Sequence, residues 1–110
     1  MQYFNKTILF PFVGEPSITL TYNTKDKIIF CEVTNLPDPT ELHFLCKTAD
    51  SITTKYDVDQ ESYNDSVIKC SLKVQISGEY TFVAGNKHTT VSKGVLVQVA
   101  SGIYMYLFQY

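Results

Sequence analysis

A period-two alternation of apolar and polar residues, repeated in short runs, is the feature that most constrains how this chain can fold. Residues 66–76 show it most clearly, and residues 41–47 repeat it. Successive side chains of a β-strand point to opposite faces, so each run predicts a strand with one buried face. Gly, Pro, Asn and Asp separate the runs, and no long window carries a helical stripe. The sequence therefore predicts an all-β protein.

The spacing of the runs predicts about seven or eight short strands, which favours an antiparallel β-sandwich with a core between two sheets. The almost continuous apolar run at residues 27–34 predicts a central, well-covered strand. Residues 57–65 are expected to form a loop or an edge, and Gly94 is expected to mark a bulge. The expected strands cover residues 6–13, 17–22, 27–34, 41–47, 52–58, 66–76, 79–84 and 89–100, and residues 103–108 form one more strand or the stub of a linker.

Size and composition point to one folded domain. A chain of 110 residues, 45% of them hydrophobic, can build one core but not two. Disorder is excluded, because aromatic and β-branched residues are abundant and only 18% of residues are charged. Three cysteines leave at least one thiol unpaired within the chain. We therefore expect residues 1–110 to form a single domain that is a piece of a longer chain.

The charge balance excludes several classes of partner. The net charge is −2, with 11 acidic residues against 9 lysines and no arginine, so the chain offers no basic field for nucleic-acid phosphates or anionic lipid. No run approaches the roughly 20 apolar residues that a membrane helix needs, so we expect membrane attachment only through a missing segment. The first residues lack the pattern of a secretory signal, which fits either a cytosolic protein or the mature part of a longer precursor.

One segment carries a family motif. Within residues 76–86, Gly78 and Tyr80 match the pattern Asp-x-Gly-x-Tyr-x-Cys, and the segment resembles the F strand and following hairpin of immunoglobulin-superfamily domains. Residues 14–20 are similar to the opening stretch of that family, and residues 29–33 to its B strand with the first cysteine. The resemblance implies an immunoglobulin-like antiparallel β-sandwich in which the tyrosine hydroxyl bonds back to the backbone before its strand.

The chain departs from the family pattern at three places. Phe82 stands where the second cysteine would be, Ile76 replaces the usual Asp, and Phe44 or Cys46 takes the place of the strand C tryptophan. The disulfide between strands B and F therefore cannot form. Family members without it include N-terminal adhesion domains of lymphocyte receptors and intracellular I-set domains of muscle proteins such as titin.

The resemblance also suggests a different cysteine pair. If Cys31 lies on strand B and Cys70 on strand E, the two face each other within one sheet, as in the sialic-acid-binding lectins of this superfamily. Those lectins use an arginine on strand F, which this chain lacks, so sialic-acid binding of that kind is excluded. The alternative is that Cys31, Cys46 and Cys70 are all small buried hydrophobes with free thiols.

The sequence contains no catalytic or metal-binding constellation. His43 is expected to be an outward, solvated strand residue and His88 a residue of a hairpin tip, neither beside a nucleophile motif. The cysteines include no Cys-x-x-Cys pair, which argues against zinc. The acidic run at residues 57–61 lacks the frame of an EF-hand loop, so a solvated loop is the better interpretation than a Ca²⁺ site. We expect no enzyme activity, no cofactor, no metal and no small-molecule substrate.

The remaining candidates for function are surfaces. An outward sheet face with apolar residues inside a charged rim indicates an interface if the apolar patch is contiguous. The alternative is that a neighbouring strand or the C-terminal tail covers the apolar residues. The face is expected to show His43, Leu45, Lys47, Tyr56, Thr81 and Val83. The hairpin residues Asn86, Lys87 and His88 form a second candidate contact.

Two functional hypotheses follow. The first is a non-enzymatic recognition or adhesion domain of a secreted or cell-surface protein, cellular or viral, that binds another protein or itself; the sequons at Asn5 and Asn64 favour an extracellular location and glycosylation. The second is an intracellular I-set module that acts as a spacer or dock in a cytoskeletal protein. It predicts a cytoplasmic location, reduced cysteines and unglycosylated sequons.

Overall fold

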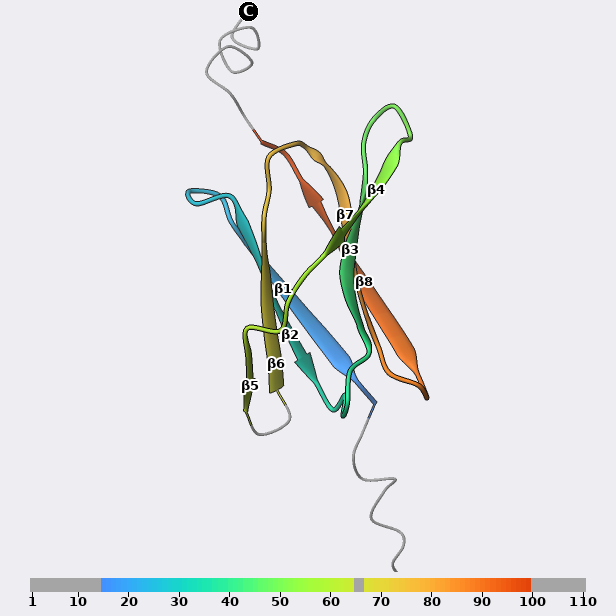
Figure 1. Ribbon diagram of the computed structural model, residues 1–110. Coiled ribbons are helices and arrows are strands. Elements are labelled where there is room, and N and C mark those ends of the chain that lie inside the picture. Colours follow the sequence, from blue (N-terminus) through green and yellow to red (C-terminus); the bar gives the residue numbers. More distant parts are fainter. Residues whose placement is uncertain (1–14, 65–66, 100–110) are drawn as a thin grey trace, which may run out of the picture.

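The computed structural model describes residues 15–64 and 67–99 (Figure 1). The expected strands at residues 6–13 and 103–108 lie outside these residues. Within the described ranges the chain forms strands and no helix, which confirms the all-β prediction. The strands are β1 (Ser17–Asn23), β2 (Ile28–Thr34), β3 (Glu41–Lys47), β4 (Thr53–Asp57), β5 (Ser62–Asn64), β6 (Val67–Lys73), β7 (Gly78–Gly85) and β8 (Thr90–Val97).

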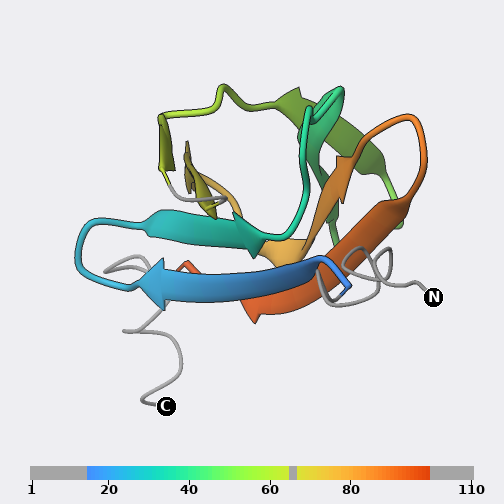
Figure 2. The same cartoon turned by 90° about the horizontal axis from the view of Figure 1, so that it is seen from below.

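The strands form two antiparallel sheets of four strands each, in the orders β1-β2-β6-β5 and β4-β3-β7-β8. The chain changes sheet between β2 and β3, between β4 and β5, and between β6 and β7. Figure 2 shows the two sheets as separate layers seen from below. A sheet with one apolar face is stable only when that face packs against another element. The apolar faces of the two sheets pack against each other here, so the architecture is a β-sandwich, as the sequence predicts.

Inward-facing residues of both sheets form one core. In β3 and β7 the alternation places Phe44 opposite Phe82 in the ladder, with ring centroids 5.0 Å apart. Phe44 also meets Tyr80 edge to face, at 6.5 Å between centroids. Such aromatic contacts add stability beyond the area they bury. The residues that are fully buried are Ile29, Cys31, Val33, Leu36, Phe44, Cys46, Ile68, Cys70, Val74, Tyr80, Phe82, Ala84 and Val97.

The structure corrects two sequence expectations about individual strands. Strand β2 is central in its sheet, between β1 and β6, as predicted, but it is covered on one face only, because Phe30 and Glu32 are exposed between buried neighbours. The sequence of residues 27–34 does not show this alternation, because the outward position 30 is occupied by an apolar residue, Phe30. Gly94 marks no bulge: the register between β7 and β8 runs unbroken through the pair Thr81 and Gly94.

The edges of the sandwich differ in how they are closed. At one side β1 approaches β8 (Figure 2). The Lys93 ammonium group of β8 donates a hydrogen bond to the Ile18 carbonyl of β1 at 3.3 Å. At the other side the three-residue strand β5 ends its sheet, so the expectation of a loop or an edge at residues 57–65 is confirmed as an edge. A very short edge strand offers few unpaired backbone groups to another chain.

The start of β7 has the local structure that the motif around Tyr80 implied. The Tyr80 hydroxyl donates a hydrogen bond of 2.7 Å to the Ile76 carbonyl, four residues upstream. At Gly78 the neighbouring strand comes so close that a β-carbon would lie 2.8 Å from the Cys46 Sγ and 2.9 Å from the Lys47 carbonyl oxygen. Glycine is therefore required here by close approach, and this approach fixes the beginning of β7 against the end of β3.

Candidate functional site

The outward side of the sheet β4-β3-β7-β8 is the surface on which five of the six residues predicted to share one sheet face meet. The core residues of β3 and β7 occupy alternate positions, so the residues between them face away from the other sheet. We call this surface the β3/β7 face. Its members are Glu41, His43, Leu45 and Lys47 of β3, Lys55 and Asp57 of β4, Glu79, Thr81 and Val83 of β7, and Leu96 of β8.

The centre of the β3/β7 face is apolar and tightly arranged. Leu45 and Val83 are half-buried, and Val83 lies directly opposite His43 in the ladder. His43 lies on the predicted face but is only 7% exposed, so the expectation of a solvated histidine is wrong. The reason is its neighbours: Asp57 and Val83 flank it on either side, and Glu41 Oε2 lies 3.5 Å from its Nδ1.

Charged residues surround this centre in an ordered way. Lys47 and Lys55 lie toward one end of the strands, whereas Glu41 and Asp57 lie toward the other. Lys55 Nζ and Asp57 Oδ1 are 3.7 Å apart on the exposed edge strand, a separation that contributes little to stability in water. Glu79 stands opposite Lys47 in the register.

Leu96 is a member of the face that sequence reasoning missed. It stands opposite Glu79 at the β8 edge and is 71% exposed, which makes it the most exposed large apolar side chain among the described residues. The run Val95, Leu96, Val97 reads as uniformly apolar, and only the pairing of β8 with β7 shows that its middle residue points outward. Leu96 adds an exposed apolar side chain at the edge of the sheet, with Glu79 and Thr81 of β7 between it and Leu45.

Tyr56 does not belong to the face on which the sequence analysis placed it. Its ladder partner is Phe44, a core residue, and Tyr56 is half-buried against the core cluster. The run at residues 53–57 has polar residues on both faces, so periodicity could not assign its sides. The structure corrects the side of Tyr56 from outward to inward.

The hairpin residues lie at one end of the sandwich, where Asn86 has a structural role. Its side-chain oxygen accepts hydrogen bonds from the amides of His88 and Thr89, at 2.8 and 3.0 Å. Its side-chain nitrogen donates to the Pro37 carbonyl at 2.8 Å. Lys87 and His88 are exposed beside a hollow of about 260 Å³ that the segment 37–40 completes. Asn86 is thus engaged in holding two loops together, and only its neighbours remain available for a contact.

The described residues do not bring a catalytic or metal-binding group together. His43 lies on the β3/β7 face and His88 in the hairpin. A shallow hollow of about 570 Å³ beside the start of β3 and the end of β4 is lined by Glu41, Asp57 and Asp59, with Lys55 at its side. No cluster of histidine, cysteine or acidic residues within ranges 15–64 and 67–99 has the geometry of a metal site.

The cysteines lie where the resemblance placed them. Cys31 of β2 and Cys70 of β6 are direct partners in the ladder, and both are buried with free thiols. Burial raises the pKa of the Cys70 thiol to about 11 and raises that of Cys31 further. Cys46 is also buried and free, but it belongs to the other sheet.

The two sequons are placed only in part. Asn5 lies outside the described residues, whereas Asn64 ends strand β5, with Ser66 of its sequon again outside them. In the part of the chain that the structure describes, no helix is long and apolar enough to span a membrane.

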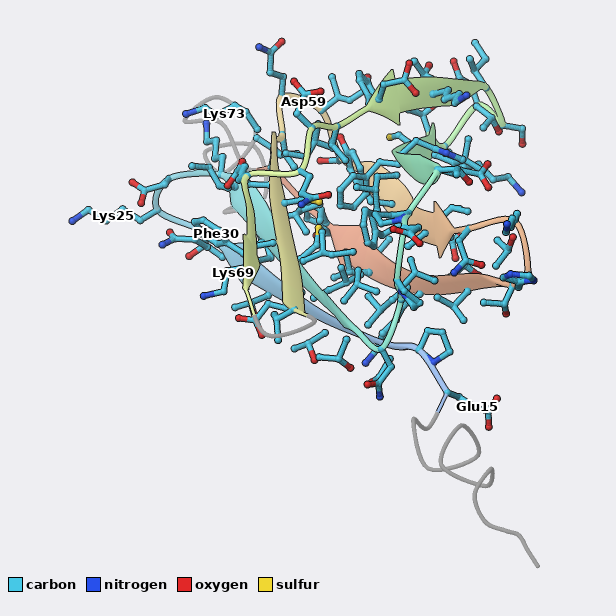
Figure 3. The ribbon with its side chains drawn as sticks, turned by 60° about the horizontal axis from the view of Figure 1, so that its bottom comes forward. Glu15, Lys25, Phe30, Asp59, Lys69 and Lys73 are labelled. Carbon is cyan, nitrogen blue, oxygen red and sulfur yellow. The ribbon has the colours of Figure 1, made fainter. Side chains whose placement is uncertain are left out.

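The outer face of the other sheet is a second surface that the sequence analysis did not single out. Phe30 is 44% exposed there, opposite Ser71, and Lys69 and Lys73 lie on either side of Ser71 on the same face of β6. Figure 3 shows Phe30 and Lys69 pointing away from the second sheet. Ile28 occupies the preceding outward position of β2 and is half-buried, so Phe30 has an apolar neighbour on its own strand. Threonines 19, 21 and 34 make much of the remaining surface polar. Exposed apolar residues of this kind are ordinary on protein surfaces.

Comparisons with known proteins add no relative to this description. No family model, curated protein or solved structure matches the chain.

Proposed function

We propose that the chain is an immunoglobulin-like domain that recognises another protein, without catalysis, through the β3/β7 face. The strand orders support the fold: read from the N-terminus as strands A to G, with β4 as C′, they become A-B-E-D and C′-C-F-G. The hydrogen bond from Tyr80 to the Ile76 carbonyl supports it further, because a tyrosine of this kind at the start of strand F is a hallmark of these domains.

The observation that carries the recognition function is the composition of the β3/β7 face. Leu45 and Val83 are diagonal neighbours on β3 and β7, Leu96 lies exposed at the β8 edge beyond Glu79 and Thr81, and charged residues surround these apolar side chains. Protein interfaces have this organisation, with an apolar centre that loses its water and a polar rim. On the opposite outer face the apolar side chains of Ile28 and Phe30 lie on the single strand β2, and the outward positions of the neighbouring strand β1 are all polar.

Binding to cells tests this proposal. Fluorescent tetramers of the 110-residue chain are applied to a panel of cell lines, with Leu45→Asp, Val83→Asp and Leu96→Asp as variants of the face. Phe30→Asp makes the same kind of change on the opposite face and is the matched control. We expect the three face variants to lose binding and the control to keep it, with circular dichroism verifying that each variant is folded.

Leu96→Asp is the decisive variant, because a side chain that is 71% exposed can be replaced without disturbing the core. The proposal is overturned if the wild-type tetramer binds neither a cell of the panel nor a surface coated with the 110-residue chain, or if the folded face variants bind as the wild type does.

The location of the domain is the second part of the proposal. The sequons at Asn5 and Asn64 favour a secreted or cell-surface protein, cellular or viral. The alternative, an intracellular I-set module that serves as a spacer or dock, is favoured by three buried thiols that are free.

Intact-mass spectrometry of chain expressed through a secretory pathway decides between the two. One disulfide together with glycan mass on Asn5 or Asn64 supports the extracellular domain. Three alkylatable cysteines and bare sequons support the intracellular module.

A further inference from the structure

Four of the five acidic and lysine side chains of the β3/β7 face, all except Glu79, are mirrored about a single level of the sheet. On β3, Lys47 and Glu41 are equally far along the strand from Phe44, on opposite sides of it. On β4, Lys55 and Asp57 flank Tyr56, which is the ladder partner of Phe44. Each lysine therefore has an acidic counterpart at the same distance from the level of Phe44 and Tyr56.

A mirrored arrangement of opposite charges is the signature of a self-complementary surface. A two-fold axis that lies in the plane of the face, across the strands at the level of Phe44, brings each position of one copy onto its counterpart in a second copy. Lys47 then meets Glu41 of the second copy, and Lys55 meets Asp57. The symmetry repeats each contact, so four pairs of opposite charge form around the centre.

We propose that the partner of the β3/β7 face is a second copy of this chain, docked face to face with its strands antiparallel. The inference rests on the proposed function, in which this face binds a protein, and it names that protein.

The remaining positions are compatible with the same axis. Phe82 is the ladder partner of Phe44, so the axis crosses β7 at the level of Phe82. Each residue of β7 on one side of Phe82 therefore meets the residue equally far on the other side in the second copy. No like charges meet, because Glu79 falls on Gly85 and the apolar residues fall on uncharged or apolar ones. The exchanged positions are Leu45 with His43, Thr81 with Val83, Glu79 with Gly85, and Leu96 with Thr90.

The other face-to-face arrangement matches fewer charges. An axis that runs along the strands between β3 and β7 exchanges these two strands and pairs Lys47 with Glu79. Lys55 then falls on Gly94, and Asp57 falls on Ser92, so neither charge meets a partner. Rim charges select orientation more than they add affinity, and here they select the antiparallel arrangement.

The size of the face indicates a weak dimer. Four strands spaced about 4.8 Å apart, with about seven residues each rising about 3.3 Å, give a flat area of about 450 Å². A stable interface of standard size buries about 800 Å² on each partner. We therefore expect association at micromolar concentrations or above, with a rapid exchange of partners.

Charge exchange tests the inference by sedimentation velocity of the 110-residue chain between about 10 µM and 1 mM. One variant carries Lys47→Glu and Lys55→Glu, and the other carries Glu41→Lys and Asp57→Lys. We expect each variant alone to dimerise at least tenfold more weakly than the wild type, because four like-charged pairs replace four opposite ones. An equimolar mixture of the two variants restores association, since each charge again meets its opposite.

The double variant Lys69→Glu with Lys73→Glu makes the same change of net charge on the other outer face and is the control. It should dimerise as the wild type does, and thermal unfolding verifies that every variant is folded. A wild type that stays monomeric to 1 mM, or a mixture that fails to associate, overturns the inference.

These outcomes are distinct from those of the cell-binding experiment. Tetramers that bind cells through the face while the chain stays monomeric would leave the recognition function intact and show that its partner is a different protein.

Discussion

Cys31 of β2 and Cys70 of β6 are directly opposite each other in an antiparallel ladder, although they are 39 positions apart in the sequence. The Val74 amide donates to the Lys27 carbonyl in the same ladder, and hydrogen-bonded pairs alternate with non-hydrogen-bonded ones, so the two cysteines form a hydrogen-bonded pair. The Cα separation of such pairs, about 5.5 Å, lies within the range of disulfides.

The cysteine register predicts the outcome of oxidative refolding. In a glutathione redox buffer, thiol–disulfide exchange should join Cys31 to Cys70 and leave Cys46 free, because Cys46 lies in the other sheet. Peptide mapping without reduction measures the linkage. The variant Cys46→Ala should give the same bridge, whereas a bridge that includes Cys46 would contradict the register.

The buried thiols predict a loss of stability in alkaline solution. Desolvation raises the pKa of Cys70 from its ordinary value of 9.0 to about 11 in the folded chain. Above pH 9 the unfolded chain loses this proton and the folded chain keeps it, so the unfolded state binds fewer protons and the free energy of unfolding falls as pH rises. The loss approaches about 1.4 kcal/mol per pH unit for Cys70, until its folded pKa is reached, and Cys31, whose pKa is raised further, adds a loss of the same kind.

Urea unfolding of the reduced chain at pH 8, 9 and 10 measures this slope. The Cys70→Ala variant starts from a lower stability but should show a shallower decline, because one of the shifted thiols is gone. Equal slopes for the two proteins would contradict the assignment.

Two glycines, Gly78 in β7 and Gly94 in β8, predict unequal losses of stability on replacement by alanine. Gly78→Ala places a β-carbon 2.8 Å from the Cys46 Sγ, and the resulting strain should cost about 1–3 kcal/mol. Gly94→Ala meets its nearest atom at 3.5 Å, an ordinary contact, and should change stability by less than about 0.5 kcal/mol. Chemical denaturation of both variants measures the difference; equal effects would mean that the close approach at Gly78 is relieved without cost.

The hydroxyl of Tyr80 predicts a small but measurable contribution. Tyr80→Phe keeps the ring against Phe44 and removes the hydroxyl that donates the hydrogen bond to the Ile76 carbonyl. The free energy of unfolding should fall by about 0.5–1.5 kcal/mol, the usual net value of such a bond. A variant as stable as the wild type in urea unfolding would show that this bond makes no net contribution.

The two roles of Asn86 predict a graded series. Asn86→Ala removes all three hydrogen bonds of the side chain and should cost about 1–2 kcal/mol. Asn86→Asp keeps the acceptor for the His88 and Thr89 amides but loses the donor to the Pro37 carbonyl, so its cost should be intermediate. Lys87→Ala, at an exposed neighbouring position, is the control and should be near neutral. Thermal unfolding ranks the series, and an Asn86→Asp variant less stable than Asn86→Ala would reverse the expected order.

Local alternation was sufficient to predict most strands and their buried faces. The strand at residues 41–47 was predicted with its boundaries and both faces correct, because one side of it is consistently apolar. It was insufficient for Tyr56, where the run is polar on both sides and only pairing with Phe44 decides the face. Alternation also missed the outward position of Phe30. Phe30 is two positions from the polar residue Glu32 and therefore lies on the same face of β2, which is the exposed one.

The candidate face depends on contacts that no local pattern contains. The burial of His43 depends on neighbours from two other strands, and Leu96 joins the face only through the pairing of β8 with β7. The order of strands within each sheet is equally non-local, since β2 pairs with β6 rather than with β3. Periodicity assigns a side to each residue but does not say which strands share that side.

The hydrogen bond from Asn86 to the Pro37 carbonyl joins the hairpin between β7 and β8 to the connection between β2 and β3. The Thr40 amide reinforces this junction by donating to the Gly85 carbonyl at 2.9 Å. The two loops therefore vary as a unit: an insertion or replacement in one must be accommodated by the other. A graft that gives this end of the domain a new specificity must transplant residues 35–40 and 86–89 together.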